Sequence, residues 1–503
     1  MSEQLSAKPK MTEIESYGVE SIPDRDRTSS AMDVFKIAFG GANSFATVLL
    51  GAFPIFFGLS LFQGLLSVLL GVLVGSAILA PMVVFGPING TNNAVSSGAH
   101  FGVVGRILGS YLSLLTAIAF YAIAVWTAGD ALVGGAIRLF GVSDSKIFRG
   151  FAYGLMALLV LVVCIYGYQF MLWINKIAVA GASIILVLGF IAFSGKINLD
   201  YAGSFSNIHA AGFWPAFLGS AFIVLSNPIS FGAFLGDWSR YVPRDSSRSK
   251  LVTMAFLSQV ASILPFVFGL VTTAVVANLA PESFKNFDYV GGLVATSPSW
   301  FLLPILLLAI IGGLSTGSTS LYGTGLDFSS IFPKLSRVKA TIIIGALSIV
   351  MIFIGRFGFN LVTSVTTFVT LIIVCTTPWM VMMMLGYLHR RGHYLPQDLQ
   401  VFNRNQKGGA YWFRGGINHE AIFIWILSAA LSLCFVNLPG QIVGPLGNLF
   451  NGLDISLLVA LVLPAILYTV FLMISPESAS LHGEKGPRFS KASSKPIAPI
   501  ENK

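Results

Sequence analysis

The sequence has few charged residues. Only 10% of its 503 residues are Asp, Glu, Lys or Arg, while 55% are hydrophobic and the mean hydropathy is +0.80. Because a soluble globular domain is about 25% charged, this composition excludes a soluble enzyme or a string of soluble domains. It indicates a protein that crosses a membrane many times.

Cysteine and histidine are also scarce. The three cysteines, Cys164, Cys375 and Cys434, lie in apolar runs without the spacing of a metal site, so we expect small buried hydrophobic residues. Most of the six histidines fall in polar segments, and only His100 lies near a predicted span. Because no triad, metal set or carboxylate pair for hydrolysis or phosphoryl transfer is visible, we expect neither enzyme activity nor an organic cofactor.

The two ends of the chain are polar. Residues 1–30 lack the pattern of a cleavable signal peptide, and residues 476–503 are rich in Pro, Ser and Lys, so we expect two flexible cytoplasmic tails. The net charge of +9 does not indicate nucleic acid, because the basic residues stand between apolar runs. That placement favours contact with anionic cytoplasmic lipid.

Apolar runs long enough to cross a bilayer, about 17–25 residues each, recur along the chain. We predict an all-α polytopic membrane protein of about twelve transmembrane helices, near residues 31–58, 62–85, 105–140, 148–168, 171–194, 213–236, 251–278, 300–326, 338–355, 359–388, 420–437 and 453–474. The long basic stretch 389–419 is predicted to be a cytoplasmic loop.

The positions of Lys and Arg predict the orientation. If both termini are cytoplasmic, all but six of the 30 basic residues lie in inner segments, the six being Arg138, Lys146, Arg149, Lys196, Lys285 and Arg356. This asymmetry predicts an even number of spans with both termini inside. We expect a multi-pass monomer in the plasma (inner) membrane.

Two predicted spans contain helix-breaking residues at corresponding positions. The first contains "FGGANSF", with Gly40, Gly41 and Asn43, and the sixth contains Asn227-Pro228. Interrupted segments at matching positions of two halves are the sequence sign of an inverted-repeat transporter, whose unwound backbone faces a central cavity. This pattern predicts two five-helix repeats, residues 31–194 and 213–388, followed by two additional helices in residues 420–475. The alternative is that the small residues only permit close packing.

The eighth span carries a cluster of hydroxyls in "GGLSTGSTSLYGTGLDF". Ser315 with Thr319, and Thr316 with Ser320, are i,i+4 pairs that can each face one side of a helix. Hydroxyl and carbonyl oxygens suit a small cation, so we predict Na⁺ at Ser315 and Thr316. The alternative for each hydroxyl is a bond to its own helix backbone.

Asp130 is the only acidic residue well inside a predicted span. An intramembrane carboxylate indicates function by default, here as a proton site. Asp130 lies toward the predicted outer end, however, and Arg138 follows two turns later. A solvated or ion-paired structural role is therefore equally open.

Several motifs together resemble one known family. The glycine-rich start of residues 39–93, with "GLS" after the first span and "FGP" closing the second, is similar to the opening of the purine–cytosine permeases, the nucleobase:cation symporter-1 family. "DWSRYVPRD", "LYGTGLDFSS" and "YWFRGGIN" resemble the family's motifs after the sixth span, at the end of the eighth and before the eleventh. The resemblance covers about residues 31–475.

This resemblance implies a five-plus-five repeat of the leucine-transporter type, plus two helices. It implies import of a nucleobase or related heterocycle driven by Na⁺ or H⁺, with the ring stacked between the third and sixth spans. The family's stacking tryptophan falls on Phe120 and its frequent amide on Ala124, which are both departures. The implied substrate site is Asn43, Ser44, Phe120, Ala124, Ser226, Asn227, Pro228 and Thr319, and the implied cation site is Gly40, Gly41, Ala42, Ser315 and Thr316.

The charged residues after the sixth span are predicted to lie at the cytoplasmic mouth. Asp237 and Arg240 are i,i+3, so they can pair if the helix continues. We interpret them as a structural or gating clasp.

The function predicted is therefore secondary active import of a cytosine-like, purine-like or similar planar ring by cation symport, with no nucleic-acid partner. An alternative is a related ring, such as hydroxymethylpyrimidine, allantoin, a hydantoin or a B-vitamin, because Ala124 cannot supply the amide. An uncoupled facilitator or channel is a further alternative, although no repeat that could form a charged or carbonyl ring is visible.

Overall fold

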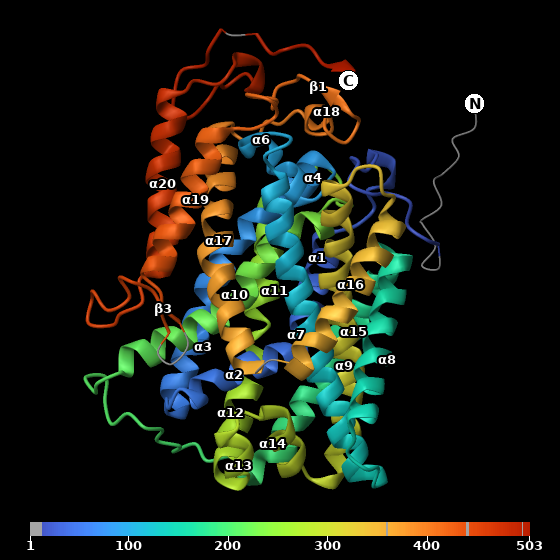
Figure 1. The fold of residues 1–503 in the computed structure, drawn as a ribbon, viewed down its shortest axis with the longest axis vertical. Coiled ribbons are helices and arrows are strands. Elements are labelled where there is room, and N and C mark those ends of the chain that lie inside the picture. Colours follow the sequence, from blue (N-terminus) through green and yellow to red (C-terminus); the bar gives the residue numbers. More distant parts are fainter. Residues whose placement is uncertain (1–12, 359–360, 439–441, 495, 503) are drawn as a thin grey trace.

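The computed structural model describes residues 13–358, 361–438, 442–494 and 496–502. The start of the predicted tenth span, residues 359–360, lies outside the described residues, as do residues 1–12 and the tail positions 495 and 503. The chain folds into an upright bundle of long helices (Figure 1), so the predicted all-α class is confirmed.

Up to Lys196 the described chain forms the 3₁₀ segments η1 (Asp24–Asp26), η2 (Ala80–Val84) and η3 (Ser194–Lys196). The helices of the first predicted half are α1 (Ala31–Ala42), α2 (Phe45–Phe56), α3 (Leu61–Leu79), α4 (Phe85–Asn89), α5 (Asn93–Ser96), α6 (Gly98–Phe101), α7 (Ile107–Phe140), α8 (Lys146–Tyr166) and α9 (Tyr168–Phe193). The second contains α10 (Phe213–Ser239), α11 (Arg248–Val260), α12 (Ile263–Leu279), α13 (Pro281–Lys285), α14 (Tyr289–Thr296), α15 (Ser299–Ile331), α16 (Arg337–Gly358) and α17 (Leu361–His389). The rest of the chain adds α18 (Pro396–Leu399), β1 (Gln406–Lys407), α19 (His419–Cys434), β2 (Asn437–Leu438), β3 (Ile442–Val443), α20 (Ser456–Ile474), η4 (Ala479–Leu481) and β4 (Glu501–Asn502).

Each of the twelve predicted segments coincides with a helix or with two consecutive helices. Among the described residues, ten helical segments are long and apolar enough to cross a membrane, and the bent pair α1–α2 makes an eleventh. Helix α19, with 16 residues, is shorter than a usual span. The count of twelve therefore stays a prediction.

The long helices pack in pairs that relate the two predicted halves. Helix α2 packs against α12 and α10 packs against α3, while α7 and α15 lie along each other at the centre. Likewise α1 packs against α9 and α10 against α17. If the first five predicted spans are exchanged in order with the next five, the pair α2–α12 becomes α10–α3 and the pair α1–α9 becomes α10–α17. The pair α7–α15 maps onto itself. The packing favours the predicted repeat, which remains a prediction.

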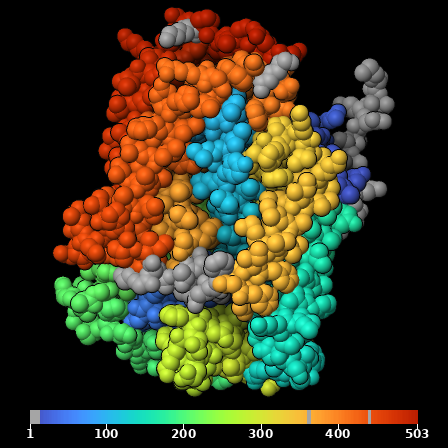
Figure 2. Space-filling model, in the orientation of Figure 1, coloured from blue at the N-terminus to red at the C-terminus, as the bar shows by residue number. Residues whose placement is uncertain are grey.

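The flanks of the bundle expose apolar side chains. Leu108, Tyr111 and Leu115 of α7 are 40–57% exposed, and Val350 of α16 and Phe423 of α19 are exposed as well. Figure 2 shows the surface of α7 as a blue column between the orange α17–α19 side and the yellow α15–α16 side. Exposed apolar bands of this kind suit contact with lipid, as the hydropathy predicts.

The predicted interruption of the sixth span is wrong. Helix α10 runs without a break through Pro228, whose ring packs against Gly75 of α3. The hydroxyls of Ser226 and Ser230 donate to the Ile223 and Asn227 carbonyls of the same helix, at 2.7 and 2.6 Å. The interruption in this half lies instead at Ala261–Ser262, between α11 and α12, and these helices pack along α1 and α2.

The two ends of the chain are packed, not loose, so the prediction of flexible tails is wrong for the described parts. Val19 is buried, and its carbonyl accepts hydrogen bonds from Thr91 and Gln400. In the C-terminal segment, Glu477 pairs with Arg390. Both ends lie at the same end of the bundle as the loop that carries α18 and β1 (Figure 1). Charge patterning predicts that this end is cytoplasmic.

Two glycines allow α2 and α12 to touch, and this contact leads to a prediction. A Cβ on Gly269 would collide with the backbone carbonyl of Val48, and one on Gly51 with that of Phe266. Gly269→Ala should therefore lower stability by about 1–3 kcal/mol through overpacking, measured as a lower thermal midpoint of the purified protein. Gly195→Ala is the matched control, because a Cβ there meets nothing within 4 Å. Equal midpoints for the two variants would contradict the close approach.

Candidate functional site

The first span bends by 57° between α1 and α2. Helix α1 ends at Ala42, Asn43 caps it with φ −93° and ψ 67°, and Ser44 is extended before α2 begins. The Asn43 side chain holds the bend, because its Nδ2 donates to Ser183 Oγ of α9 at 2.8 Å. The predicted break in this span is confirmed. It leaves carbonyls at the C-terminal end of α1, the negative end of the helix dipole, without helical partners.

The hydroxyl of Thr316 on α15 reaches this bend. Thr316 Oγ1 lies 2.6 Å from the Gly41 carbonyl oxygen and 2.6 Å from Ser44 Oγ. All three residues are buried, Thr316 with 2% exposure. Three uncharged oxygens from the first and eighth predicted spans therefore converge at one point, as the sequence predicted for Gly41 and Thr316. Ser44, predicted to contact substrate, belongs to the same cluster.

Small residues permit this approach of α1, α9 and α15. A Cβ on Gly312 would lie 2.9 Å from Ser44 Cβ, and one on Gly40 would lie 2.6 Å from Asn175 Oδ1. Asn175 of α9 in turn accepts the Ser315 hydroxyl at 2.6 Å. Sequence reasoning missed Asn175, although an amide inside the apolar fifth run is a visible signal. Ser315 thus faces α9, next to the Thr316 cluster.

Two other hydroxyls of the predicted cluster, those of Thr319 and Ser320, bond to their own helix. Thr319 Oγ1 lies 3.1 and 2.9 Å from the Ser315 and Thr316 carbonyls, and Ser320 donates to the Thr316 carbonyl at 2.9 Å. Thr319 Oγ1 is nevertheless only 2.8 Å from the position of a Cβ on Gly41. Ala42 lies buried in the last turn of α1. Thr319 is thus on the face of α15 that meets the bend.

The residues predicted to stack on the substrate lie deeper in the bundle. Phe120 of α7 is 2% exposed and makes an edge-to-face contact with Phe368 of α17, with ring centroids 5.4 Å apart. Ala124, one turn later, is buried, and its carbonyl oxygen lies 3.9 Å from the position of a Cβ on Gly313 of α15. Ala124 therefore faces α15 one turn before the hydroxyl cluster begins.

The predicted residues of the sixth span occupy α10. Asn227 is 2% exposed, and its Nδ2 has no hydrogen-bond partner among the described residues. Ser226 bonds back to its own helix, and Pro228 faces α3. Of these three, only Asn227 keeps a polar group available.

Asp130 is ion-paired. Its Oδ1 lies 2.9 Å from Arg356 Nη2 and 3.3 Å from Arg149 Nη1, and Tyr153 donates to it. Arg138, the neighbour seen in the sequence, bonds instead to carbonyls at the C-terminal end of α14. Of the two roles left open for Asp130, this geometry supports the structural ion pair.

At the predicted cytoplasmic mouth, Arg240 does not pair with Asp237, contrary to our expectation. Arg240 Nη2 lies 2.7 Å from Glu15 Oε1 of the N-terminal segment, and the same nitrogen donates to Tyr322 at 2.8 Å. The i,i+3 spacing suggested a local pair, but Arg240 lies beyond the end of α10 and its guanidinium points to a segment 225 residues away. No local pattern shows such a contact.

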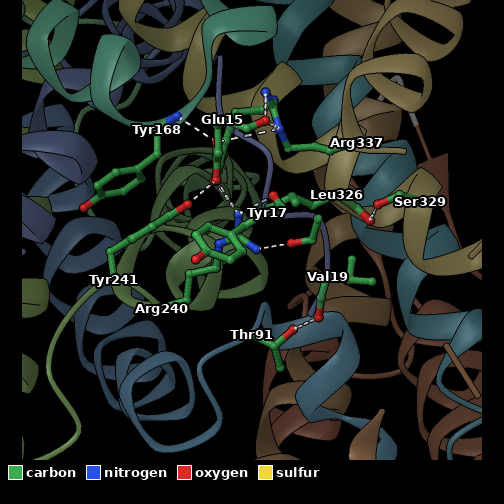
Figure 3. A network of polar contacts seen from close by, with 12 residues as sticks. Glu15, Tyr17, Val19, Thr91, Tyr168, Arg240, Tyr241, Leu326, Ser329 and Arg337 are labelled. Carbon is green, nitrogen blue, oxygen red and sulfur yellow. Dashed lines mark hydrogen bonds and ion pairs between the residues drawn. The ribbon is translucent and has the colours of Figure 1, made fainter. Parts of the chain in front are cut away.

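Glu15 joins four parts of the mouth, namely α9, the segment after α10, α15 and α16 (Figure 3). Its carboxylate accepts from the Tyr168 amide of α9 at 2.9 Å, from Tyr322 of α15 at 2.9 Å and from Tyr241. Arg337 of α16 donates to the Glu15 carbonyl at 3.1 and 3.0 Å and lies 3.7 Å from the carboxylate. Burial would raise the pKa of Glu15, but the guanidiniums of Arg240 and Arg337 lower it below its ordinary value. The N-terminal segment is therefore a fixed part of the mouth.

A further cluster of polar side chains lies in and around the C-terminal segment. Atoms of His389, Glu477 and His482 that could bind a metal lie within 4.8 Å of one another. Glu477, however, makes two bonds to Arg390, and His389 Nδ1 accepts the Phe489 amide at 3.3 Å. A cation here would face the charge of Arg390, so we interpret the group as the anchor of this segment.

Comparison with known proteins places this geometry in context. A family model described as "Permease for cytosine/purines, uracil, thiamine, allantoin" matches residues 21–460. The putative purine-cytosine permease YxlA of Bacillus subtilis is 25% identical over 478 residues, covering 91% of this chain and 96% of that protein. The vitamin B6 transporter TPN1 of Saccharomyces cerevisiae is 23% identical, covering 71% of this chain and 62% of that protein.

Solved structures share the fold. Mhp1, a nucleobase-cation-symport-1 family transporter in a closed conformation with bromovinylhydantoin bound, aligns with a TM-score of 0.66 at 16% identity, covering 92% of this chain and 94% of that one. A Na⁺-coupled sialic acid symporter in an outward-open state aligns with a TM-score of 0.56 at 18% identity, covering 88% and 90%.

Proposed function

We propose, because the chain belongs to the family of permeases for cytosine/purines, uracil, thiamine and allantoin, that it imports a nucleobase or a similar planar heterocycle by cation symport. The family is one of permeases, so the chain is a membrane-embedded transporter and not an enzyme. The finer parts of the proposal are the coupling to a cation, the class of ring and import through the plasma (inner) membrane.

The contact of Thr316 with the bend of the first span carries the proposal of cation coupling. Gly41, Ser44 and Thr316 present carbonyl and hydroxyl oxygens to one another at the end of α1, where the helix dipole is negative. Unwound carbonyls and helix C-termini are where such transporters hold a coupling ion. A cation held there would order the bend before the substrate arrives. By linkage, the substrate would raise cation affinity by the same factor.

The electrical driving force follows from the same site. Each positive charge carried inward gains about 2.3 kcal/mol per 100 mV of membrane potential. The site residues are uncharged, so a bound cation would add one positive charge to the loaded carrier relative to the empty one.

The buried aromatic and amide groups favour a planar ring as substrate. Phe120 offers a π face, and stacking on it would contribute about 1 kcal/mol beyond burial. Asn227 supplies an amide donor without a protein partner among the described residues. Asn43, Ser44, Ala124 and Thr319 complete the proposed substrate site, whereas Ser226 bonds to its own helix and Pro228 faces α3, so neither offers a polar group to the ring.

A related ring is the second candidate. Ala124 contributes no hydrogen-bonding side chain beside α15, so it cannot supply the amide that the family resemblance implies for a cytosine-like ring. The similarity to a vitamin B6 transporter favours the same alternative, which includes hydroxymethylpyrimidine, allantoin, a hydantoin or a B-vitamin. An uncoupled facilitator would carry the same rings without a response to Na⁺ or pH.

A thermal-shift panel tests substrate and ion together. We expect one class of heterocycle to raise the melting midpoint of the purified protein, more so with Na⁺ present, because a ligand at 100 times its Kd stabilises by about 2.7 kcal/mol. Phe120→Leu should weaken apparent affinity about fivefold, since about 1 kcal/mol of stacking is lost, whereas Phe151→Leu, on the exposed flank, should not. No shift with any ring would overturn the substrate class. Uptake into vesicles that ignores both Na⁺ and the proton gradient would overturn symport.

A further inference from the structure

Two fully buried carboxylates lie between α10 and α15 near the predicted cytoplasmic mouth. Asp237 of α10 and Asp327 of α15 are each 1% exposed. The predicted spans ended before both residues, but the helices extend past them, to Ser239 and Ile331. The sequence indicated that Asp130 is the only acidic residue well inside a span. The structure places Asp237 and Asp327 inside helices as well.

The two carboxylates lie in one layer. Asp237 Oδ2 is 2.8 Å from the position of a Cβ on Gly323, and Gly323 and Asp327 are one helical turn apart on the same face of α15. Asn92 Nδ2 donates to Asp327 Oδ1 at 3.2 Å, and Asn93 Nδ2 donates to the Gly232 carbonyl of α10 at 2.8 Å. Two consecutive asparagines thus connect α15 to α10, with one carboxylate on each side.

Most oxygens of this pair have no hydrogen-bond donor. Among the described residues, neither oxygen of Asp237 and only Oδ1 of Asp327 has a partner by geometry. The Oδ1 of Asn93, which lies against Gly236, is also without one. A buried carboxylate ion usually accepts several hydrogen bonds, because otherwise its desolvation is not offset. A proton or a cation bound to these oxygens would offset the desolvation of the carboxylates, whereas another hydrogen-bond acceptor would not.

The nearby positive charges are engaged elsewhere or are not in contact. Arg240, at the end of α10, is hydrogen-bonded to Glu15 and Tyr322. Arg106, before α7, donates through Nη2 to Asn403 at 2.7 Å, leaves Nε and Nη1 without a hydrogen-bond partner, and is not within ion-pair distance of Asp327 among the described residues. The groups that act on the pair are thus each other, Arg106, Arg240, the Asn93 backbone amide and the Ser113 hydroxyl. None of them supplies a hydrogen bond to the open oxygens.

We propose that Asp237 and Asp327 form a proton-binding site that holds an exchangeable proton while the mouth is closed. A proton on one carboxyl group removes its buried charge, and two carboxylates in one layer rarely ionise together. We assign a proton rather than Na⁺ because one proton neutralises a buried carboxylate without the full set of oxygen ligands that a metal cation requires.

This site deepens the proposed function, on which its role in transport rests. If α10 and α15 separate when the mouth opens, water reaches both carboxylates and solvates their charged forms. The proton would then leave toward the predicted cytoplasmic side. Opening of the mouth would thus be linked to proton release. Release of a proton, rather than of Na⁺, would accompany the change to the inward-open state.

Infrared difference spectroscopy of the full-length protein in lipid vesicles tests the site without transport. We expect a carboxylic-acid C=O band near neutral pH that shifts in D₂O and fades as the pH rises. Asp237→Asn and Asp327→Asn should each remove it, and either variant suffices if the other fails to fold. Asp144→Asn is the control, because Asp144 is exposed and paired with Arg149 at 2.8 Å.

A band unchanged in both variants, or lost only in Asp130→Asn, would overturn the proposal. A pH-sensitive dye inside the vesicles gives the second readout, with substrate-driven proton entry expected in the wild type and lost in both variants. Failure of every heterocycle to enter would sink the proposed function and leave the infrared result standing. Proton-independent uptake together with no band would sink the site alone.

Discussion

Replacing Arg240 by glutamine is expected to destabilise the protein by about 3–5 kcal/mol, because breaking a buried ion pair leaves its partner charge uncompensated. The Arg240 side chain is fully buried and Glu15 is 8% exposed. Without Arg240, the Glu15 carboxylate keeps only Arg337, at 3.7 Å, as a positive partner. The carbonyls of Tyr17 and Gly18 would also lose their donor. The N-terminal segment should then detach from the mouth.

The measurement combines the thermal midpoint of purified protein with limited proteolysis of residues 13–29. Arg244→Gln is the matched control, since Arg244 is exposed on the same loop. A double variant, Glu15→Gln with Arg240→Gln, should cost less than the sum of the two single changes, because the pair is then removed as a unit. Simple additivity, or an Arg240→Gln protein as protease-resistant as the Arg244→Gln control, would contradict the contact seen here.

The course of the helices could be predicted from the sequence because hydropathy acts locally. A run of about twenty apolar residues is long enough to cross a bilayer as a helix whatever its tertiary neighbours are, so each predicted segment coincides with helix. The bend at Asn43 was also visible, since two glycines, an asparagine and a serine interrupt an apolar run. Pro228 was misjudged for a tertiary reason, because Gly75 of α3 accommodates its ring and α10 continues past it.

The site was predictable only in part. The residues alone predicted a break in the first span and a hydroxyl cluster suited to a cation, whereas the pairing of Thr316 with Gly41 was implied by the family resemblance. Glu15 could not be found, because it lies in a polar tail and its partners are 153 to 322 residues away. Asp327 fell one residue beyond the predicted eighth span, which ended at residue 326. Its burial depends on Asn92 and on the extra turn of α15, which no local pattern specifies.

Thr316→Val should abolish most of the cation response while leaving the fold intact. Valine keeps the shape of threonine but removes the oxygen that lies 2.6 Å from both the Gly41 carbonyl and Ser44 Oγ. The buried carbonyl then loses its partner, at a cost of about 1–3 kcal/mol, and the cation loses a ligand. We therefore expect the Na⁺ concentration for half-maximal substrate binding to rise about tenfold or more.

The comparison that isolates this effect is Thr324→Val, two turns further along α15. Thr324 is fully buried too, but its hydroxyl donates to the Ser320 carbonyl of its own helix at 3.0 Å, and no hydrogen bond from it to another span is seen among the described residues. Both variants lose one hydroxyl from one helix, so only the junction with α1 differs between them. Na⁺ titrations of substrate binding on the purified proteins should separate them, with Thr324→Val close to wild type. If Thr316→Val keeps the wild-type Na⁺ response, the coupling ion does not bind where α15 meets the bend.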